Sequence, residues 1–496
     1  MNTRIARSLI VFLLALAFAL QSTTIFGQAA AVNTSAAAET TADDFDFGDF
    51  DLDSLFEDES ALEIDEGEVI ENPEARLFAE NSFTWAGDFY GKAGTILGWE
   101  STPSSLSDLN SFDDALTADL KLRLWFDARP DRHFRVFGKF VTGWPFSQTI
   151  LTVDPTSSTG FSNANIPNIS VFEIFADFNW EDTVFFRFGK QTSGWGLSRF
   201  YQIGDPLSVA VKDPANPTED LEGPVALRIS YPLGVHTLYA VTALKDSYLP
   251  TDGTPASVGD LGFGIKGDFL ISVPKNPIIS NGELSLGAWY QKNLAPKFVA
   301  GYSTGIGNFQ IFTDQLLTWG LDSVRVGDST KRDSDLFWSA TLGSMYVQND
   351  WHFTAYGEYL FSGPGSTDKD VYALFLERLA AEYGPGATLP PTLNPSDIGG
   401  FLSRHNSALS LSWSELFGTD KLSFSALWLQ NWVDRSGTTN GKIRLSPFKH
   451  FAIETGLSFS WGGSSDEWII KTGNFVTKEP VRTSASLAFI LGSGKF

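Results

Sequence analysis

Apolar and polar side chains alternate along most of the chain from residue 81 onward, in segments of about ten residues separated by turns. In the segment 116–127, Leu120 and Leu124 fall on one face, whereas Lys121 and Arg123 fall on the other. Successive side chains of a β-strand point to opposite faces, so this period of two predicts a strand with one apolar and one polar face.

The same alternation recurs often enough to decide the fold class. A soluble sheet covers its apolar face with other elements, but this chain offers almost nothing to provide the cover. A closed barrel solves the problem, because its apolar face meets lipid and its polar face lines a lumen. We therefore predict an all-β fold, a transmembrane antiparallel up-and-down β-barrel with short periplasmic turns and long external loops. The other clear segments are 134–144, 172–180, 184–191, 261–271, 284–291, 351–361 and 451–461.

The number of strands depends on one region. Both ends of such a barrel lie on the periplasmic side, so the number is even. Eighteen strands can be placed if Lys297–Ser303 and Asn308–Leu317 form a hairpin across Gly305-Ile306-Gly307. If this region is one long external loop, sixteen strands result. We expect eighteen.

One stretch between Ser362 and Ser403 is typical of a helix. Val371, Leu374, Phe375 and Leu379 fall at helical spacing, and Gly384-Pro385 provides a stop. This helix either rests on the external loops or forms a gate over the mouth of the barrel.

The N-terminal region divides into two predicted segments. Arg4 and Arg7 precede an apolar run from Leu9 to Leu20, which is too short to span a bilayer well, so residues 1–28 are predicted to be a signal peptide. A single N-terminal anchor helix is the alternative.

Residues 29–80 are predicted to be a disordered, acidic periplasmic tail, and 81–496 to be the barrel. Fourteen Asp and Glu residues lie between Asp43 and Glu71, with no Lys or Arg between Arg7 and Arg76. The tail is either a solvated spacer or a docking segment for a periplasmic partner.

Composition narrows the function. The net charge of −24 argues against nucleic-acid binding, which needs a basic surface. The absence of cysteine excludes a lipoprotein anchor, a disulfide framework and a thiolate metal site. We expect no cofactor and no metal site, because no corresponding motif occurs. The terminal Phe496 is typical of barrels that the barrel-assembly machinery recognises, and the predicted surroundings are outer-membrane lipid and lipopolysaccharide.

A short motif resembles a known family. Arg187-Phe188-Gly189-Lys190-Gln191 is followed by Gly194-Trp195-Gly196 and by a loop that carries Asp205-Pro206. This pattern is similar to that of Gram-negative outer-membrane porins of the substrate-specific kind, including the alginate-export type. Lys190 stands where arginine is commoner in that family. The resemblance implies outer-membrane localisation, a loop folded into the lumen, and passive passage of small hydrophilic solutes.

Charge suggests where a pore constriction would lie. If the loop Thr192–Gly223 folds inward, it carries acidic side chains into the lumen, where basic side chains of the strands face them. Opposed charges would create a transverse field that selects solutes. The alternative is that lumenal charges pair only to satisfy one another. The predicted constriction residues are Arg123, Arg135, Arg187, Arg228, Asp205, Asp213 and Asp220.

Two other functions are weighed against the channel. An outer-membrane hydrolase would need a convergent set of residues, and the nearest hint is His405 beside Asn406 and Ser407. Adjacent residues of a strand face opposite ways, so these three do not converge easily, and we predict no enzymatic activity. An adhesin or structural barrel with a closed lumen is the remaining alternative to a porin.

Overall fold

A computed structural model describes most of the chain after residue 81. The described residues are 82–105, 107–145, 148–153, 161–166, 169–192, 194–207, 212–217, 223–244, 258–271, 279–322, 324–326, 328, 332–383, 402–472 and 481–492. The predicted signal peptide, the predicted acidic tail, Asp220 and Phe496 lie outside them.

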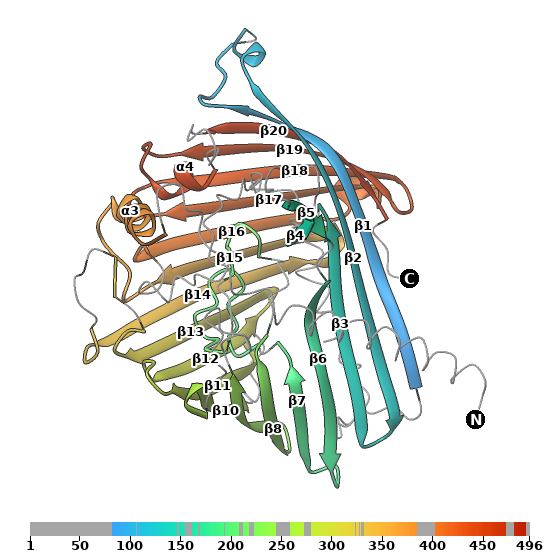
Figure 1. Cartoon of the computed structure of the whole chain (residues 1–496), viewed down its shortest axis with the longest axis vertical. Coiled ribbons are helices and arrows are strands. Elements are labelled where there is room, and N and C mark those ends of the chain that lie inside the picture. Colours follow the sequence, from blue (N-terminus) through green and yellow to red (C-terminus); the bar gives the residue numbers. More distant parts are fainter. Residues whose placement is uncertain are drawn as a thin grey trace. The chain divides into compact units, whose positions relative to one another are not determined.

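Eighteen antiparallel strands pair in chain order, and the last one closes the ring by pairing with the first (Figure 1). Closure runs from Gly91 opposite Leu491 to Trp99 opposite Thr483. The fold therefore confirms the predicted closed barrel and the prediction of eighteen strands. The first nine strands are β1 (Ser82–Trp99), β2 (Asp113–Asp131), β3 (Phe134–Trp144), β6 (Ile169–Trp180), β7 (Val184–Lys190), β8 (Val225–Leu233), β9 (His236–Leu244), β10 (Leu261–Ile271) and β11 (Ile279–Gln291). The other nine are β12 (Lys297–Ile306), β13 (Phe309–Trp319), β14 (Leu336–Gln348), β15 (Phe353–Phe361), β16 (His405–Trp413), β17 (Leu422–Asn431), β18 (Gly437–Phe448), β19 (Phe451–Trp461) and β20 (Thr483–Leu491).

The hairpin that decided the number of strands is present. β12 and β13 pair throughout, from Lys297 opposite Thr318 to Ile306 opposite Phe309. The chain reverses at Gly307, whose φ of 59° lies in the left-handed region that glycine adopts without strain. The sixteen-strand alternative is therefore wrong.

The two faces of the sheet separate as the alternation predicts. Leu116 on β2 and Phe188 on β7 point outward and are 89% and 57% exposed. Arg123 and Arg187, on the same two strands, point into the lumen and pair with aspartates of neighbouring strands. A closed barrel with an apolar outer face is the architecture of outer-membrane proteins, so the fold agrees with the predicted outer-membrane localisation. No helix among the described residues is long and apolar enough to span a membrane.

The connections differ between the two ends of the barrel. One end has tight turns, such as Asp131–Phe134, Trp180–Val184 and Leu233–His236, and we call it the short-turn end. The other end, the long-loop end, carries most of the long connections, including 190–225 and 361–405. β1 begins at the short-turn end, where Ser82 lies opposite Arg129 of β2.

The long connections contain further elements. The predicted helix is α3 (Val371–Tyr383), which ends one residue before the predicted stop. Val371, Tyr372 and Phe375 of α3 are buried. Sequence analysis did not predict the hairpin of β4 (Gln148–Val153) and β5 (Phe161–Ile166) or the short helix α4 (Glu467–Thr472). Four short 3₁₀ turns complete the described structure: η4 (Asp108–Asn110), η5 (Val258–Asp260), η6 (Asn349–Trp351) and η8 (Leu416–Gly418).

Candidate functional site: the lumen and its crossing segment

The connection between β7 and β8 enters the lumen, as the sequence predicted for the loop Thr192–Gly223. Its described residues 194–207, which we call the crossing segment, form the green trace that leaves β7 in Figure 1. Trp195 and Leu207 pack against a first group of lumen-facing side chains on β8, β9, β11 and β12, among them Trp289. The two ends of the crossing segment are therefore attached to the same region of the wall.

The middle of the crossing segment packs against a different region of the wall. Phe200, Tyr201 and Ile203 are buried against side chains of β13 to β17, including Phe312 and Tyr356. The rings of Phe200 and Tyr356 lie 5.5 Å apart between centroids. The segment thus extends from the first group of strands, β8 to β12, to the adjacent group, β13 to β17, and it occupies some of the lumen.

Two buried carboxylates fix the backbone of the crossing segment. Glu358 on β15 is 4% exposed and accepts hydrogen bonds from three consecutive backbone N–H groups. Arg199 and Phe200 donate to Oε2 at 3.0 and 3.2 Å, and Tyr201 donates to Oε1 at 2.8 Å. Buried N–H groups need acceptors, and a charged acceptor forms a stronger bond than a neutral one.

Asp314 on β13 has the same role for the two residues that precede Arg199. It is 1% exposed, and its Oδ2 accepts hydrogen bonds from the N–H groups of Leu197 and Ser198, both at 2.8 Å. The hydroxyl of Ser198 also bonds that of Thr341 on β14 at 2.5 Å. Sequence analysis included Glu358 in the predicted strand 351–361 but assigned no role to either carboxylate.

The glycines of the Gly-Trp-Gly motif differ in what surrounds them. A Cβ on Gly196 would lie 3.0 Å from Oδ2 of Asp314, and one on Gly204 would lie 3.0 Å from Cγ of the same residue. A Cβ on Gly194 would meet nothing within 4 Å. The second glycine of the motif therefore allows the backbone to approach Asp314 closely, and Trp195 supplies the buried ring next to it.

Three of the predicted arginines lie in one row across the wall. Arg135 on β3 is opposite Asp177 on β6, which is opposite Arg187 on β7, and Arg187 is opposite Arg228 on β8. We call these four residues the arginine row. Asp177 binds both of its neighbours, with Arg187 Nε at 2.6 Å and Arg135 Nη1 at 3.2 Å. The row thus contains three guanidinium groups and one aspartate.

Aromatic rings and one further aspartate support the row. The guanidinium carbon of Arg187 lies 4.1 Å from the ring centroid of Phe175, and that of Arg228 lies 5.7 Å from that of Tyr239. Both distances are in the range of cation–π contacts. Arg135 also binds Asp127 of β2, with Nε at 3.1 Å.

The remaining predicted constriction residues lie elsewhere. Arg123 binds Asp88 of β1 at 2.9 Å. Asp205 accepts a hydrogen bond from the N–H of Leu207 at 3.0 Å, and Asp213 accepts one from the N–H of Ala215 at 2.9 Å. Among the described residues, Arg123, Arg135 and Arg187 therefore pair with aspartates on the barrel strands, namely Asp88, Asp127 and Asp177. Sequence analysis did not assign these aspartates to the constriction. A direct opposition of Asp205, Asp213 and Asp220 to the arginines stays a prediction.

Asp213 contributes to a cluster at the long-loop end. Burial raises the pKa of Tyr372 on α3 to about 12. The positive charge of Lys471 lowers this pKa, and the negative charges of Glu467 and Asp213 raise it. Burial lowers the pKa of Lys471 on α4, but Glu467, Tyr372 and Asp213 raise it by more. The pKa of Lys471 therefore lies above its ordinary value. The carboxylate of Asp213 thus acts on the two helices that pack at this end.

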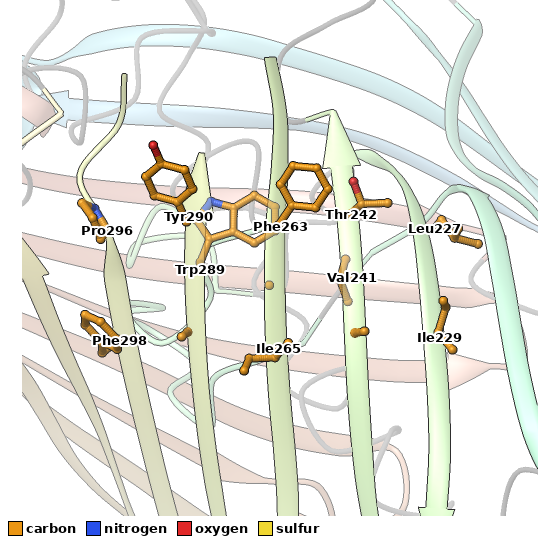
Figure 2. Close-up of a pocket in the computed structure, with 13 residues that line it drawn as sticks. Leu227, Ile229, Val241, Thr242, Phe263, Ile265, Trp289, Tyr290, Pro296 and Phe298 are labelled. Atoms are coloured by element: carbon orange, nitrogen blue, oxygen red, sulfur yellow. The ribbon is translucent and has the colours of Figure 1, made fainter. Parts of the chain in front are cut away.

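An apolar hollow of about 520 Å³ lies on the outer face of β8 to β12 (Figure 2). Phe263, Ile265, Tyr290 and Phe298 around it are exposed and belong to the outward face. This hollow lies on the lipid-facing side and not in the lumen, so its residues are part of the surface that contacts the membrane.

The three residues that hinted at catalysis do not converge. The ring of His405 bonds the hydroxyl of Tyr359 at 2.6 Å, and Ser407 accepts a hydrogen bond from Trp432 Nε1 at 2.8 Å. Asn406 is buried and donates to the backbone of Ser403. Among the described residues, no group of three His, Asp or Glu side chains could hold a metal ion.

Comparisons with known proteins find similarity in structure but not in sequence. No family model and no curated protein matches the chain. Solved structures that resemble it include Pseudomonas aeruginosa OccK8 (OprE), with a TM-score of 0.44, 10% identity and coverage of 83% of this chain and 98% of that one. Acinetobacter baumannii OccAB4 has a TM-score of 0.44, 10% identity and coverage of 84% and 99%. The outer membrane protein opdK of Pseudomonas aeruginosa has a TM-score of 0.40, 9% identity and coverage of 83% and 99%.

The strand pairing shows that the described residues form a closed antiparallel barrel of eighteen strands, and residues 187–206 resemble the porin pattern described in the sequence analysis.

Proposed function

We propose that this barrel is an outer-membrane diffusion channel for small hydrophilic solutes with a charged constriction. The constriction lies between the crossing segment and the wall that carries the arginine row. Arg123, Arg135, Arg187 and Arg228 form its basic side, and the connection that bears Asp205, Asp213 and Asp220 forms the other. Arg123 adds positive charge on the same side of the wall, beside Asp88.

The observation that carries this proposal is the fixed position of the crossing segment. Five backbone N–H groups bind Asp314 and Glu358, so the segment is held inside the lumen and narrows it. A narrowed lumen brings a passing solute within reach of the wall, where the charge of lining side chains decides which solutes pass.

The chemistry of the row favours anions. A guanidinium group stays charged at every physiological pH and binds carboxylate or phosphate through two parallel hydrogen bonds. The row brings three guanidinium groups together on one stretch of the wall, where Asp177 and Asp127 balance part of their charge. We expect organic anions to pass more readily than cations of the same size.

The test replaces Arg123, Arg187 and Arg228 together by alanine and measures ion selectivity in planar bilayers. The reversal potential in a KCl gradient should shift toward cation selectivity, and conductance should rise because three long side chains are lost. Arg332→Ala is the matched control, since Arg332 pairs with Asp328 and Asp335 in the connection between β13 and β14. Unchanged selectivity and conductance would remove the three arginines from the constriction.

The closed-lumen alternative has its own measurement. Liposomes that contain the purified barrel should swell in isotonic sugars, amino acids and organic acids if solutes pass. Absence of swelling together with absence of conductance in bilayers would favour an adhesin or structural barrel. Hydrolysis of phospholipid or peptide by the same preparation would favour an enzyme.

A further inference from the structure

A pocket of about 510 Å³ opens on the lumen side of β10 to β14, close to the short-turn end, and we call it the mouth pocket. Its lining includes Gly307 and Asn308, which form the tight turn between β12 and β13 at that end. The arginine row lies on β3 to β8, so the mouth pocket belongs to a different part of the wall. The side chains that line it include Leu270, Glu283, Ser303, Gln310, Met345 and Val347.

One row of cross-strand neighbours forms the part of the mouth pocket that is farther from this turn. Leu270 of β10 lies opposite Glu283 of β11, and Glu283 lies opposite Ser303 of β12. Glu283 shares its face of β11 with Trp289, which packs against the crossing segment, so this row faces the lumen. Directly opposite side chains have their Cβ atoms about 4.5–5.5 Å apart, so one small ligand can contact all three.

A second row of cross-strand neighbours lies closer to the turn. Gly305 of β12 lies opposite Gln310 of β13, which lies opposite Met345 of β14. Gly305 has no side chain, which leaves room beside Gln310. Met345 is buried in the same cluster as Phe200 and Tyr201 of the crossing segment. The mouth pocket therefore adjoins the packing that holds the crossing segment in the lumen.

Glu283 supplies the charge of the mouth pocket. Asp268 and Lys266 of β10 both act on it electrostatically, with opposite signs. Lys266 Nζ binds Asp268 Oδ1 at 3.0 Å, and the hydroxyl of Ser285 donates to the same oxygen at 2.5 Å. Within the described part of the chain, the carboxylate of Glu283 forms neither a hydrogen bond nor an ion pair. The mouth pocket therefore offers a carboxylate to a ligand.

This chemistry favours an organic cation over other ligands. A carboxylate repels an anion, and a neutral solute would take water from the carboxylate and return only the weaker hydrogen bonds of neutral donors. Among the described residues, no three His, Asp or Glu side chains are placed to hold a metal ion. An ammonium group has three N–H donors, and the carboxylate of Glu283, the hydroxyl of Ser303 and the amide oxygen of Gln310 can accept them.

The rest of the lining suits an apolar group next to that charge. Leu270 is 41% exposed on the lumen side, and Met345 and Val347 extend the apolar surface toward the turn. Pockets of about 300–1,000 Å³ that combine apolar walls with a few polar groups are typical of small-molecule sites. The polar groups fix the orientation of the ligand, and a flexible methionine adapts to its shape.

We infer that the mouth pocket is a binding site for a small organic cation that carries an apolar part. Its ammonium or guanidinium group contacts the carboxylate of Glu283, and its apolar part contacts Leu270, Met345 and Val347. The inference goes beyond the proposed function, because it adds a cation site to a lumen in which the arginine row favours anions. Binding at this site does not require the barrel to conduct.

The first experiment measures binding of phenethylammonium by equilibrium dialysis of the mature chain in nanodiscs of zwitterionic lipid, with empty nanodiscs as the blank. The native barrel should bind it more tightly than phenethyl alcohol or phenylpropionate, which carry the same ring and differ in charge. Glu283→Gln should weaken binding of the cation about tenfold to hundredfold, because hydrogen bonds to a charged acceptor are lost. Glu283→Asp should retain most of the affinity.

The matched control for these variants is Glu415→Gln. Glu415 lies at the same end of the barrel, in the connection between β16 and β17, and its carboxylate lies 3.3 Å from Nε2 of His352. It does not line the mouth pocket, so its replacement should leave the affinity for phenethylammonium unchanged.

The second experiment fills the pocket and leaves its charge in place. Gly305 lies within β12 and its φ is not in the left-handed region, so valine fits its backbone. Gly305→Val should weaken binding of phenethylammonium several-fold more than binding of methylammonium, because the space for the ring is lost. Ile306→Val, at the adjacent outward-facing position, is the control and should change neither.

The third experiment tests the charge of the pocket without a bound ligand. The chain has no cysteine, so a Gln310→Cys variant has a single thiol. A methanethiosulfonate that carries an ammonium group should modify this thiol several-fold faster than one that carries a sulfonate. The two rates should become similar when Glu283→Gln is added, whereas Glu415→Gln should leave their ratio unchanged. Higher salt should lower the ratio, because mobile ions screen the attraction.

The outcomes separate this inference from the proposed function. Binding that needs Glu283 in a barrel that does not conduct would support the inference and remove the channel. A barrel that conducts but binds phenethylammonium no better than phenethyl alcohol would overturn the inference and leave the channel. Equal affinity of the native barrel and Glu283→Gln would also overturn the inference, as would equal labelling rates of the two methanethiosulfonates.

Discussion

Two regions of the lumen wall use charged side chains in different ways. On β13 and β15, the carboxylates of Asp314 and Glu358 are buried and bind backbone N–H groups of the crossing segment. On β3 to β8, the arginines bind an aspartate of the same wall and stack on aromatic rings. Both groups of residues occupy the same kind of position, an inward-facing site on an alternating strand.

The difference shows that charged side chains that face the lumen can have different structural roles. A carboxylate that faces a loop becomes an anchor, because the buried N–H groups of that loop require acceptors. The arginines of the row instead bind aspartates on the barrel strands, Asp177 and Asp127, so there the charged side chains pair with one another and not with the crossing segment. In the channel that we propose, the acidic region of the wall would set the shape of the lumen, and the basic region would set its selectivity.

The largest effect is expected from Glu358→Ala. The N–H groups of Phe200 and Tyr201 lose their acceptor, and that of Arg199 keeps only the hydroxyl of Tyr356 at 3.2 Å. Each unsatisfied group costs about 1–3 kcal/mol, so the crossing segment should detach. Single-channel conductance should rise, and a protease should cut the segment in the folded barrel. Glu415→Ala, in the connection between β16 and β17, is the control and should change neither. An unchanged conductance would mean that Glu358 does not anchor the segment.

A selectivity change without a change of lumen shape is expected from Asp177→Asn. The two bound arginines lose their shared negative charge, so the net charge of this part of the wall becomes more positive. The reversal potential in a KCl gradient should move toward anion selectivity, opposite to the effect of removing arginines. Asp182→Asn, in the turn between β6 and β7, serves as the control. A shift toward cations would contradict the role given to the row.

A moderate loss of stability is expected from Gly196→Ala. The added Cβ would lie 3.0 Å from Oδ2 of Asp314, and overpacking of this kind costs about 1–3 kcal/mol. The crossing segment should become easier to cleave, and the unfolding temperature should fall slightly. Gly194→Ala is a close control, since its Cβ would meet nothing within 4 Å. If Gly196→Ala and Gly194→Ala behave alike, the close approach of the Gly196 backbone to Asp314 is contradicted.

The smallest effect is expected from Asp213→Asn. Its charge helps to keep the pKa of Lys471 above the ordinary value, so the substitution should lower that pKa and change the reversal potential less than any change in the row. A raised pKa in the folded state stabilises the protein below the unfolded pKa of about 10.4, and this stability is lost as pH rises through the folded value. The variant should therefore lose stability at a lower alkaline pH than the native chain. A shift in selectivity larger than that of Asp177→Asn would mean that Asp213 contributes more to the constriction than the row does.

The face of each strand could be predicted because a period of two is a local property. Leu116 and Arg123 needed only their own segment, and α3 needed only the spacing from Val371 to Leu379. Sequence analysis missed β4, β5 and α4 because each has only six residues, too few to reveal a regular spacing of apolar positions.

The partners of inward charges could not be predicted in this way. Glu358 binds residues more than 150 positions earlier in the chain, and Asp314 binds residues more than 110 positions earlier. The arginine row exists only because four strands share one register, which a single strand does not encode. The motif around Gly194-Trp195-Gly196 did indicate that the following connection enters the lumen, but it gave no information on what holds it there.

The seam between the first and last strands sets a condition on biogenesis. Every other interface joins strands that are consecutive along the sheet-forming stretch of the chain, whereas the one between β1 and β20 joins segments nearly four hundred residues apart. A nascent chain that stops before Thr483 would present two bare strand edges, on β1 and β19, to any neighbouring polypeptide. Closure of the barrel therefore depends on β20, because it is the strand that pairs with both of these edges.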